Sequence, residues 1–155
     1  MHADDSFGED GVAGAQKGLT SVKLTAIAIE KFDRTQPDFS QIAPKITKAG
    51  AQVVLVVASS AAVVDAIKAL RVASSHAQVV TLSNNASGGF IKSLGDNARG
   101  VIVTQVFLQS IGFKLVKEAN DLARTQNIMK VSPVMLGGFA AAKVLVEALR
   151  HSRLP

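Results

Sequence analysis

The sequence predicts an α/β fold: a Rossmann-like parallel β-sheet flanked by helices, in three α/β/α layers. Two short β-rich apolar runs, at residues 53–58 and 78–82, are separated by a helical pattern at residues 61–73. This alternation is typical of a parallel sheet with crossover helices. The first run is apolar throughout, as expected for a strand that is covered on both faces. In the helix, apolar residues recur at i, i+4 and i+7, at positions Val63, Ile67 and Leu70.

A helix and a strand are predicted ahead of this unit. Residues 6–19 have a helical pattern led by Asp4 and Asp5, whose carboxylates suit the positive end of a helix dipole. Glycines weaken this helix, so tertiary packing must stabilise it. They are Gly8, Gly11, Gly14 and Gly18. Residues 24–32 then have the pattern of a strand.

A second helix is expected to start with a cap in residues 38–41 and to run to Ala49, with Gly50 as its stop. Pro44 fits this helix only if the helix begins near Ser40, because a proline further inside would remove a backbone hydrogen bond.

The chain after residue 82 is predicted to continue the alternation and then to leave it. An Asn-Asn turn is followed by a short helix at 89–94 and a last strand at 100–107. Two helices, at 111–125 and 134–152, come next with no strand between or after them. The second has one narrow polar stripe and is apolar elsewhere, which indicates burial on more than one side. We therefore expect its normal partner to be absent from this chain.

Composition indicates one globular domain and excludes several classes of function. The 155 residues are 48% hydrophobic and 19% charged, and can bury roughly two thirds of their unfolded surface. The net charge of +5 comes from scattered Lys and Arg residues, so the basic stripe that nucleic-acid binding requires is missing. The absence of cysteine excludes disulfides and thiolate sites.

No apolar run is long enough to cross a membrane. The N-terminus is acidic, whereas a secretory signal would be cationic and then apolar. We expect any export signal to lie outside this sequence.

The sequence offers no pattern of catalytic, metal or cofactor chemistry. The three histidines are far apart and are expected to be solvated surface residues, and none has a second ligand at metal-binding spacing. No nucleophile elbow, P-loop or complete dinucleotide fingerprint occurs. The acidic cluster at residues 4–10 is interpreted as helix capping. The sequence therefore predicts a protein that is not an enzyme and binds no cofactor.

A ligand site is predicted where parallel strands end, because loops and helix N-termini converge at that edge of a sheet. This rule selects three turns: Ser6-Phe7-Gly8, Ser59-Ser60 and Ser83-Asn84-Asn85. The predicted ligand-binding residues in them are Phe7, Gly8, Ser59, Ser60, Ser83 and Asn84.

Each turn also has a purely structural interpretation. Phe7 fits a core or staple residue, and either Ser59 or Ser60 fits a helix N-cap. Ser83 and its neighbours fit ordinary turn chemistry.

The residues quoted so far resemble the type I periplasmic binding proteins, in the leucine/isoleucine/valine-binding branch. The segment Asp4-Asp5-Ser6-Phe7-Gly8 is similar to the Asp-x-x-aromatic-Gly segment that opens the second lobe of these proteins. The other similar segments follow in the family's order: Phe32-Asp33-Arg34, Asp38-Phe39-Ser40, Ala58-Ser59-Ser60, Leu94-Gly95, Gly100 to Val106 and Gly138 to Leu149.

The resemblance implies a two-lobed clamp that closes on a small solute and presents it to a membrane ABC permease. Residues 1–106 would be the second, C-terminal lobe without its first strand. Residues 107–155 would be helices that pack on the missing first lobe. The parent protein would be periplasmic, with branched-chain amino acids or related small carboxylates as ligands.

The resemblance also places ligand contacts at Phe7, Ser59 and Ser83. Family members that bind amino acids can carry a carboxylate at the position of Ser83, where it pairs with the ligand ammonium, and they often place tyrosines around the ligand. This chain has a serine there and no tyrosine. An unpaired buried ammonium is costly, so a carboxylate-bearing or aromatic-acid ligand is at least as plausible.

Two other functions remain open at this point. The same clamp fold serves as the sensory lobe of receptors and regulators, and a flavodoxin-like nucleotide binder or enzyme would share the alternation of strands and helices. The missing Gly-rich phosphate loop argues against the second. The apolar C-terminal helices further predict a homo-oligomer.

Overall fold

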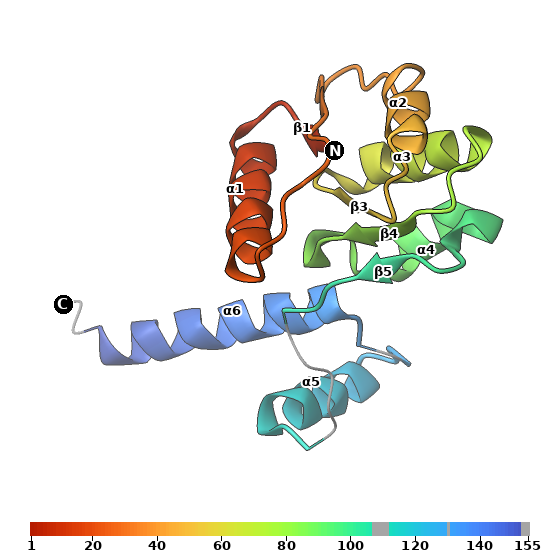
Figure 1. Cartoon of the computed structure of the whole chain (residues 1–155). Coiled ribbons are helices and arrows are strands. Elements are labelled where there is room, and N and C mark those ends of the chain that lie inside the picture. Colours follow the sequence, from red (N-terminus) through yellow and green to blue (C-terminus); the bar gives the residue numbers. More distant parts are fainter. Residues whose placement is uncertain (107–111, 130, 153–155) are drawn as a thin grey trace. The chain divides into compact units, whose positions relative to one another are not determined.

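The computed structural model of the chain describes residues 1–106, 112–129 and 131–152 (Figure 1). Contacts divide the chain into two compact units, Met1–Thr104 and Gln105–Pro155. Each unit is described by itself below. The predicted strand end at Phe107 and the predicted helix start at Ile111 lie outside the described residues.

The first unit is built on parallel strands. They are β1 (His2–Ala3), β2 (Lys31–Phe32), β3 (Val53–Val56), β4 (Gln78–Thr81) and β5 (Ile102–Val103). The ladders pair β1 with β2 and join β3, β4 and β5, and every pairing is parallel. A further parallel bridge between His2 and Val57 connects the two ladders. The strand order is therefore β2-β1-β3-β4-β5, a doubly wound order in which the chain changes direction between β1 and β3.

Helices flank these strands. They are α1 (Ser6–Ser21), α2 (Ile42–Lys48), α3 (Ser60–Val72) and α4 (Gly88–Leu94), with short 3-10 helices η1 (Ser83–Asn85) and η2 (Gly95–Ala98). Figure 1 shows α1 on one side of the strands and α2, α3 and α4 on the other. This arrangement confirms the predicted α/β fold, with a parallel sheet flanked by helices.

The core of the first unit lies between the strands and α3. The helical periodicity seen in the sequence is correct, since Val63, Ile67 and Leu70 are fully buried. Val56 and Val79, from neighbouring strands, are also fully buried. One expectation for β3 is wrong: Val53 is 60% exposed. At this end of β3 only β4 pairs with the strand, and the bridge to β1 is four residues further on, at Val57.

Two predicted strands are much shorter in the structure. Within residues 24–32 only Lys31–Phe32 forms a strand, and within residues 100–107 the strand is Ile102–Val103. The strand at residues 24–32 is short because β1 provides hydrogen-bonding partners only beside residues 30–32. An apolar segment without a neighbouring strand cannot form a ladder.

The second helix is also shorter than predicted, and its start explains Pro44. The helix α2 begins at Ile42, so Pro44 lies in its first turn, where backbone N–H groups have no partner within the helix. No side chain caps this helix. The Asp38 carboxylate instead accepts a hydrogen bond from the backbone N–H of Ser40 at 2.8 Å, just ahead of it. Gly50, with φ of +70°, ends the segment as expected.

His2 corrects the expectation that all three histidines are solvated. It is only 3% exposed, and its Nδ1 lies 3.0 Å from the carbonyl oxygen of Ala3. The burial follows from its place in β1, which has a strand on each side. His76 and His151 are exposed, as expected.

The second unit contains α5 (Lys114–Thr125) and α6 (Pro133–His151). A small cluster of Val116, Ala119 and Leu136 joins them. Lys143 donates a hydrogen bond to Glu118 across the pair, and this bond holds the pKa of Glu118 below its usual value.

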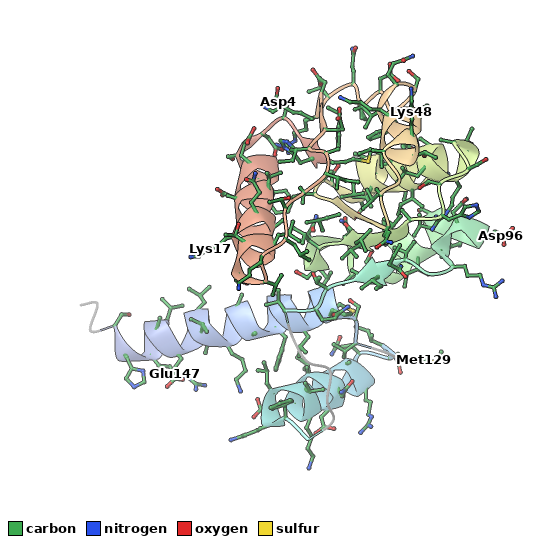
Figure 2. The ribbon with its side chains drawn as sticks, viewed as in Figure 1. Asp4, Lys17, Lys48, Asp96, Met129 and Glu147 are labelled. Carbon is green, nitrogen blue, oxygen red and sulfur yellow. The ribbon has the colours of Figure 1, made fainter. Side chains whose placement is uncertain are left out.

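Most of α6 is apolar and exposed apart from a polar stripe. Glu147, labelled in Figure 2, pairs with Arg150 and with His151 at 3.5 Å each. Leu136 is the one buried residue of this helix, whereas Val144, Leu145 and Leu149 are each more than half exposed. Within the described residues, no helix has the length and apolar character needed to cross a membrane.

Candidate functional site

A small pocket lies at the carboxyl ends of the strands in the first unit. Its volume is about 240 Å³. The segments that follow β1, β2, β3 and β4 all contribute to its wall. The lining residues are Ala3, Asp5, Phe7, Phe32, Arg34, Ala58, Ser59, Ala62 and Asn84. The pocket therefore occupies the place where β1 and β3 diverge, which is where open parallel sheets bind ligands.

The start of α1 forms one side of this pocket. Asp5 is the N-cap residue, and its Oδ1 accepts a hydrogen bond from the backbone N–H of Gly8 at 2.7 Å. Its Oδ2 lies 3.2 Å from a guanidinium nitrogen of Arg34. The interpretation of the acidic cluster as capping is thus confirmed for Asp5. Both carboxylate oxygens are engaged, so Asp5 holds the turn together. Arg34 is two-thirds exposed, and its guanidinium has N–H groups beyond the nitrogen that is paired with Asp5.

Two other acidic residues at the head of α1 bind Lys31. Asp4, labelled in Figure 2, and Glu9 each place a carboxylate oxygen 2.9 Å from its ammonium. The hydrogen bonds to Glu9 and then Asp4 raise the pKa of Lys31. These ion pairs connect α1 to β2 and neutralise acidic charge beside the pocket.

Gly8 is required for the approach of α1 to β1. A Cβ atom at this position would lie 2.0 Å from the carbonyl oxygen of Ala3. Gly8 is buried and does not line the pocket. Its function in the site is to let the first turn of α1 approach the strand end and bring Phe7 to the pocket edge.

Phe7 is 44% exposed and lines the pocket. This exposure excludes the interpretation of Phe7 as a core residue. Its ring offers an apolar surface at the mouth of a pocket that also contains charged and polar groups.

The start of α3 forms the opposite side. Ser59 occupies the N-cap position but its side chain makes no capping hydrogen bond. The backbone N–H groups of residues 60–62 therefore have no acceptor among the described residues. The Ser60 hydroxyl donates to Oδ1 of Asn85 at 2.7 Å. Neither serine hydroxyl caps the helix, which corrects the expectation that capping explains them.

Asn85, which lies in the third predicted turn but is not one of the six predicted site residues, is a buried amide that organises this side. Asn85 is fully buried, and besides accepting from Ser60 its Nδ2 donates to Thr81 Oγ1 at 2.8 Å and to the carbonyl of Ala58 at 3.3 Å. Asn84 donates to the same carbonyl at 3.0 Å. The signal in the sequence was the pair of asparagines directly after an apolar strand.

The structure thus brings together three of the six predicted site residues around one pocket: Phe7, Ser59 and Asn84. Gly8 lies behind the side formed by α1, and Ser60 lies behind the side formed by α3. Ser83 begins η1 and does not line the pocket. Asp5 and Arg34 were not predicted as site residues, although both lie in segments quoted for the family resemblance. Contact of any of these residues with a ligand stays a prediction.

The pocket is suited to an anion attached to a small apolar group. Arg34, the free N–H groups of α3, the Ser59 hydroxyl and the Asn84 amide can donate to a carboxylate. Phe7 can cover an apolar substituent. No group of three or more potential metal ligands occurs among the residues that the structure describes.

Comparison with known proteins identifies the family of this chain. The family model described as periplasmic binding protein matches residues 1–154. A search of curated proteins finds no significant match.

Solved structures of such receptors share the fold. A possible leucine/isoleucine/valine-binding protein from Rhodopirellula baltica SH 1 superposes with a TM-score of 0.79 at 21% identity, over 99% of this chain and 44% of that protein. An extracellular ligand-binding receptor from Verminephrobacter eiseniae ef01-2 gives 0.78 at 26% identity, over 97% and 44%. A Rhodospirillum rubrum protein named for branched-chain amino acid ABC transport gives 0.74 at 16% identity, over 88% and 39%.

The chain spans less than half the length of these solved relatives. The family match covers almost all of it, and the structural matches are to receptors of one type. The chain therefore belongs to the periplasmic binding protein family and has the fold of its leucine/isoleucine/valine-binding receptors.

Proposed function

We propose that this chain supplies one wall of the ligand-binding cleft in the solute-binding component of an ABC transporter. The observation that carries the proposal is the pocket at the divergence of β1 and β3, lined by Phe7, Ser59, Arg34 and Asn84. The family match favours this function over a flavodoxin-like nucleotide binder. In the parent protein the first lobe would close over the pocket, and a membrane permease would receive the solute from the periplasm.

The proposed ligands are branched-chain amino acids or related small carboxylates. This wall offers a guanidinium, helix N–H groups and a hydroxyl, all of which suit a carboxylate. It offers no spare anion for a ligand ammonium, because both oxygens of Asp5 are already engaged by Gly8 and Arg34. Recognition of an ammonium would fall to the other lobe. The chemistry is binding without catalysis, and residues 107–155 would belong with the other lobe.

A matched set of ligands tests this assignment. We expect isovalerate and leucine to bind the chain with a Kd in the millimolar range, about −4 kcal/mol, because one wall gives only part of the contacts. Isoamylamine, which has the same apolar group without the carboxylate, should not bind. Phe7→Ala should weaken isovalerate binding about tenfold, or ~1.4 kcal/mol. Ligand-observed NMR titration measures these affinities.

The control for Phe7→Ala is Phe113→Ala, which removes a similarly exposed ring from the second unit. This variant should bind isovalerate as the unmodified chain does. Equal binding of the amine and the carboxylate, or an unchanged affinity in Phe7→Ala, would contradict the proposed site.

We also propose that the isolated chain associates with itself through α6. The exposed apolar residues of α6 would cover one another in a second copy, since large exposed apolar patches are unfavourable in water. We expect sedimentation velocity to show an oligomer that dissociates on dilution. Leu145→Glu, which places a charge on this face, should shift the chain to monomer. A monomer at all concentrations would contradict the proposal.

A further inference from the structure

The side chains that line the pocket at the strand ends carry no net charge. Asp5 and Arg34 are the two charged lining residues, and they form an ion pair at 3.2 Å. The other lining residues are alanine, phenylalanine, serine and asparagine. The start of α3 adds a partial positive charge through its free N–H groups. A ligand with one negative charge therefore balances this pocket, whereas a positive charge on the ligand has no partner among the lining residues.

Asp5 is committed to other partners and cannot serve a ligand ammonium. Its Oδ1 caps α1 by accepting a hydrogen bond from a backbone N–H at 2.7 Å, and its side chain is only 18% exposed. Turning this carboxylate toward a ligand would break the helix cap, which is itself destabilising. Two neighbouring acidic residues, Asp4 and Glu9, are both bound to Lys31 and do not line the pocket.

The backbone carbonyl groups of the pocket lining are occupied as well. The carbonyl of Ala58 accepts hydrogen bonds from Asn84 at 3.0 Å and from Asn85 at 3.3 Å. The carbonyl of Ala3 accepts a hydrogen bond from the backbone N–H of Asp5 at 3.0 Å. An ammonium has three hydrogens to donate and needs an acceptor for each when it leaves water. These carbonyls are already used by the protein.

Asn84 supplies a neutral acceptor in addition to its donor. Its Nδ2 donates to the carbonyl of Ala58 at 3.0 Å and to Oδ1 of Asn85 at 3.4 Å. A carbonyl can only accept, so the amide nitrogen must face Ala58, and this contact fixes the orientation of the amide. The Oδ1 of Asn84 accepts no hydrogen bond from another described residue, and the side chain lies exposed in the pocket lining. It can therefore accept a hydrogen bond from a ligand.

Ser59 lies close to this acceptor. It directly follows Ala58, whose carbonyl Asn84 binds, and it lines the same pocket. Its hydroxyl makes no capping hydrogen bond, so it can both donate to a ligand and accept from one. A hydroxyl on the ligand could donate to Asn84 and accept from Ser59 at the same time. An ammonium could only donate.

We infer that this pocket is selective for a small α-hydroxy acid and discriminates against the α-amino acid of the same carbon skeleton. Arg34 and the start of α3 hold the carboxylate, Asn84 and Ser59 hold the hydroxyl, and Phe7 covers the apolar end. The inference rests on the proposed function, because it concerns the same pocket. It narrows the ligand from amino acids or related carboxylates to one class with a neutral α-substituent.

Three ligands that share one carbon skeleton test the inference. Leucic acid carries a hydroxyl at the α-carbon, leucine carries an ammonium there, and isocaproate carries only hydrogen. Leucic acid should bind about fivefold more tightly than isocaproate, because it gains hydrogen bonds to Asn84 and Ser59. Leucine should bind about tenfold more weakly than leucic acid, because its ammonium loses water without meeting an anion. Ligand-observed NMR titration at neutral pH gives the three Kd values.

Asn84→Asp is the most informative variant, because it exchanges the neutral acceptor for an anion of nearly the same size. The preference should reverse, so that leucine binds more tightly than leucic acid, since the new carboxylate pairs with the ammonium. Asn84→Ala should instead lower the affinity for leucic acid to about that for isocaproate. The melting temperature of each variant, followed by circular dichroism, shows whether the first unit remains folded.

The control is Asn97→Asp, which adds the same charge to the first unit at a residue that does not line the pocket. This variant should keep the preference for leucic acid. Isocaproate binding that weakens in Phe7→Ala, together with equal affinities for leucic acid and isocaproate, would overturn the inference and leave the proposed function standing. A preference for leucine in the unmodified chain would do the same. Failure of all three acids to bind would overturn both.

Discussion

Gly8→Ala is expected to destabilise the first unit by about 3 kcal/mol, because the new methyl group has no space. The ideal Cβ would lie 2.0 Å from the carbonyl oxygen of Ala3 and 3.0 Å from its carbonyl carbon. These are backbone atoms, so no side-chain rotation relieves the clash. The start of α1 must move away from β1, which would also displace Phe7 and the Asp5 cap. Urea denaturation measures the change in the free energy of unfolding.

The matched control is Gly14→Ala in the same helix. No atom lies within 4 Å of a Cβ at Gly14. Alanine has the higher helix propensity, so this variant should be more stable by about 0.5–1 kcal/mol. The two substitutions are chemically identical and should act in opposite directions. Similar effects from both would show that helix propensity alone governs this segment.

Asn85→Ala is expected to lower the free energy of unfolding by about 2–3 kcal/mol. The change removes an amide that is fully buried and bonds to Ser60, Thr81 and Ala58. Water reaches these groups poorly, so part of their hydrogen bonding would be lost. The start of α3 would also lose its tie to the turn after β4, and isovalerate binding should weaken.

Asn97→Ala is the control for this variant. Asn97 makes one local hydrogen bond, to the carbonyl of Leu94 at 3.3 Å. Its removal should cost less than about 1 kcal/mol. A double-mutant cycle of Asn85→Ala with Ser60→Ala should give a coupling energy of about 1 kcal/mol. Additive effects would mean that the hydroxyl and the amide do not act together.

The local pattern of the sequence was enough to predict the elements that depend on periodicity. Apolar spacing located α3, and its predicted and observed bounds differ by one residue at each end. The predicted strand at residues 24–30 is absent because a strand needs a paired neighbour as well as a suitable composition. The burial of His2 was not predicted because it comes from pairing with strands far along the chain.

The candidate site was predictable in position but not in detail. The rule that ligands bind at strand ends selected three turns, and Phe7, Ser59 and Asn84 from these turns line one pocket. It could not tell which asparagine faces the pocket and which is buried. Gly8 appeared only as a weak helix former, because the close approach to Ala3 is a tertiary feature. Arg34 enters the pocket through its ion pair with Asp5, which spacing alone does not show.

The most direct test of the proposed function is a crystal structure of the chain grown with a high concentration of isovalerate. The proposed function predicts the ligand in the pocket at the strand ends, with its carboxylate within hydrogen-bonding distance of Arg34, Ser59 or the first N–H groups of α3, and its apolar end against Phe7. An ordered ligand at another position, with this pocket filled only by solvent, would contradict it.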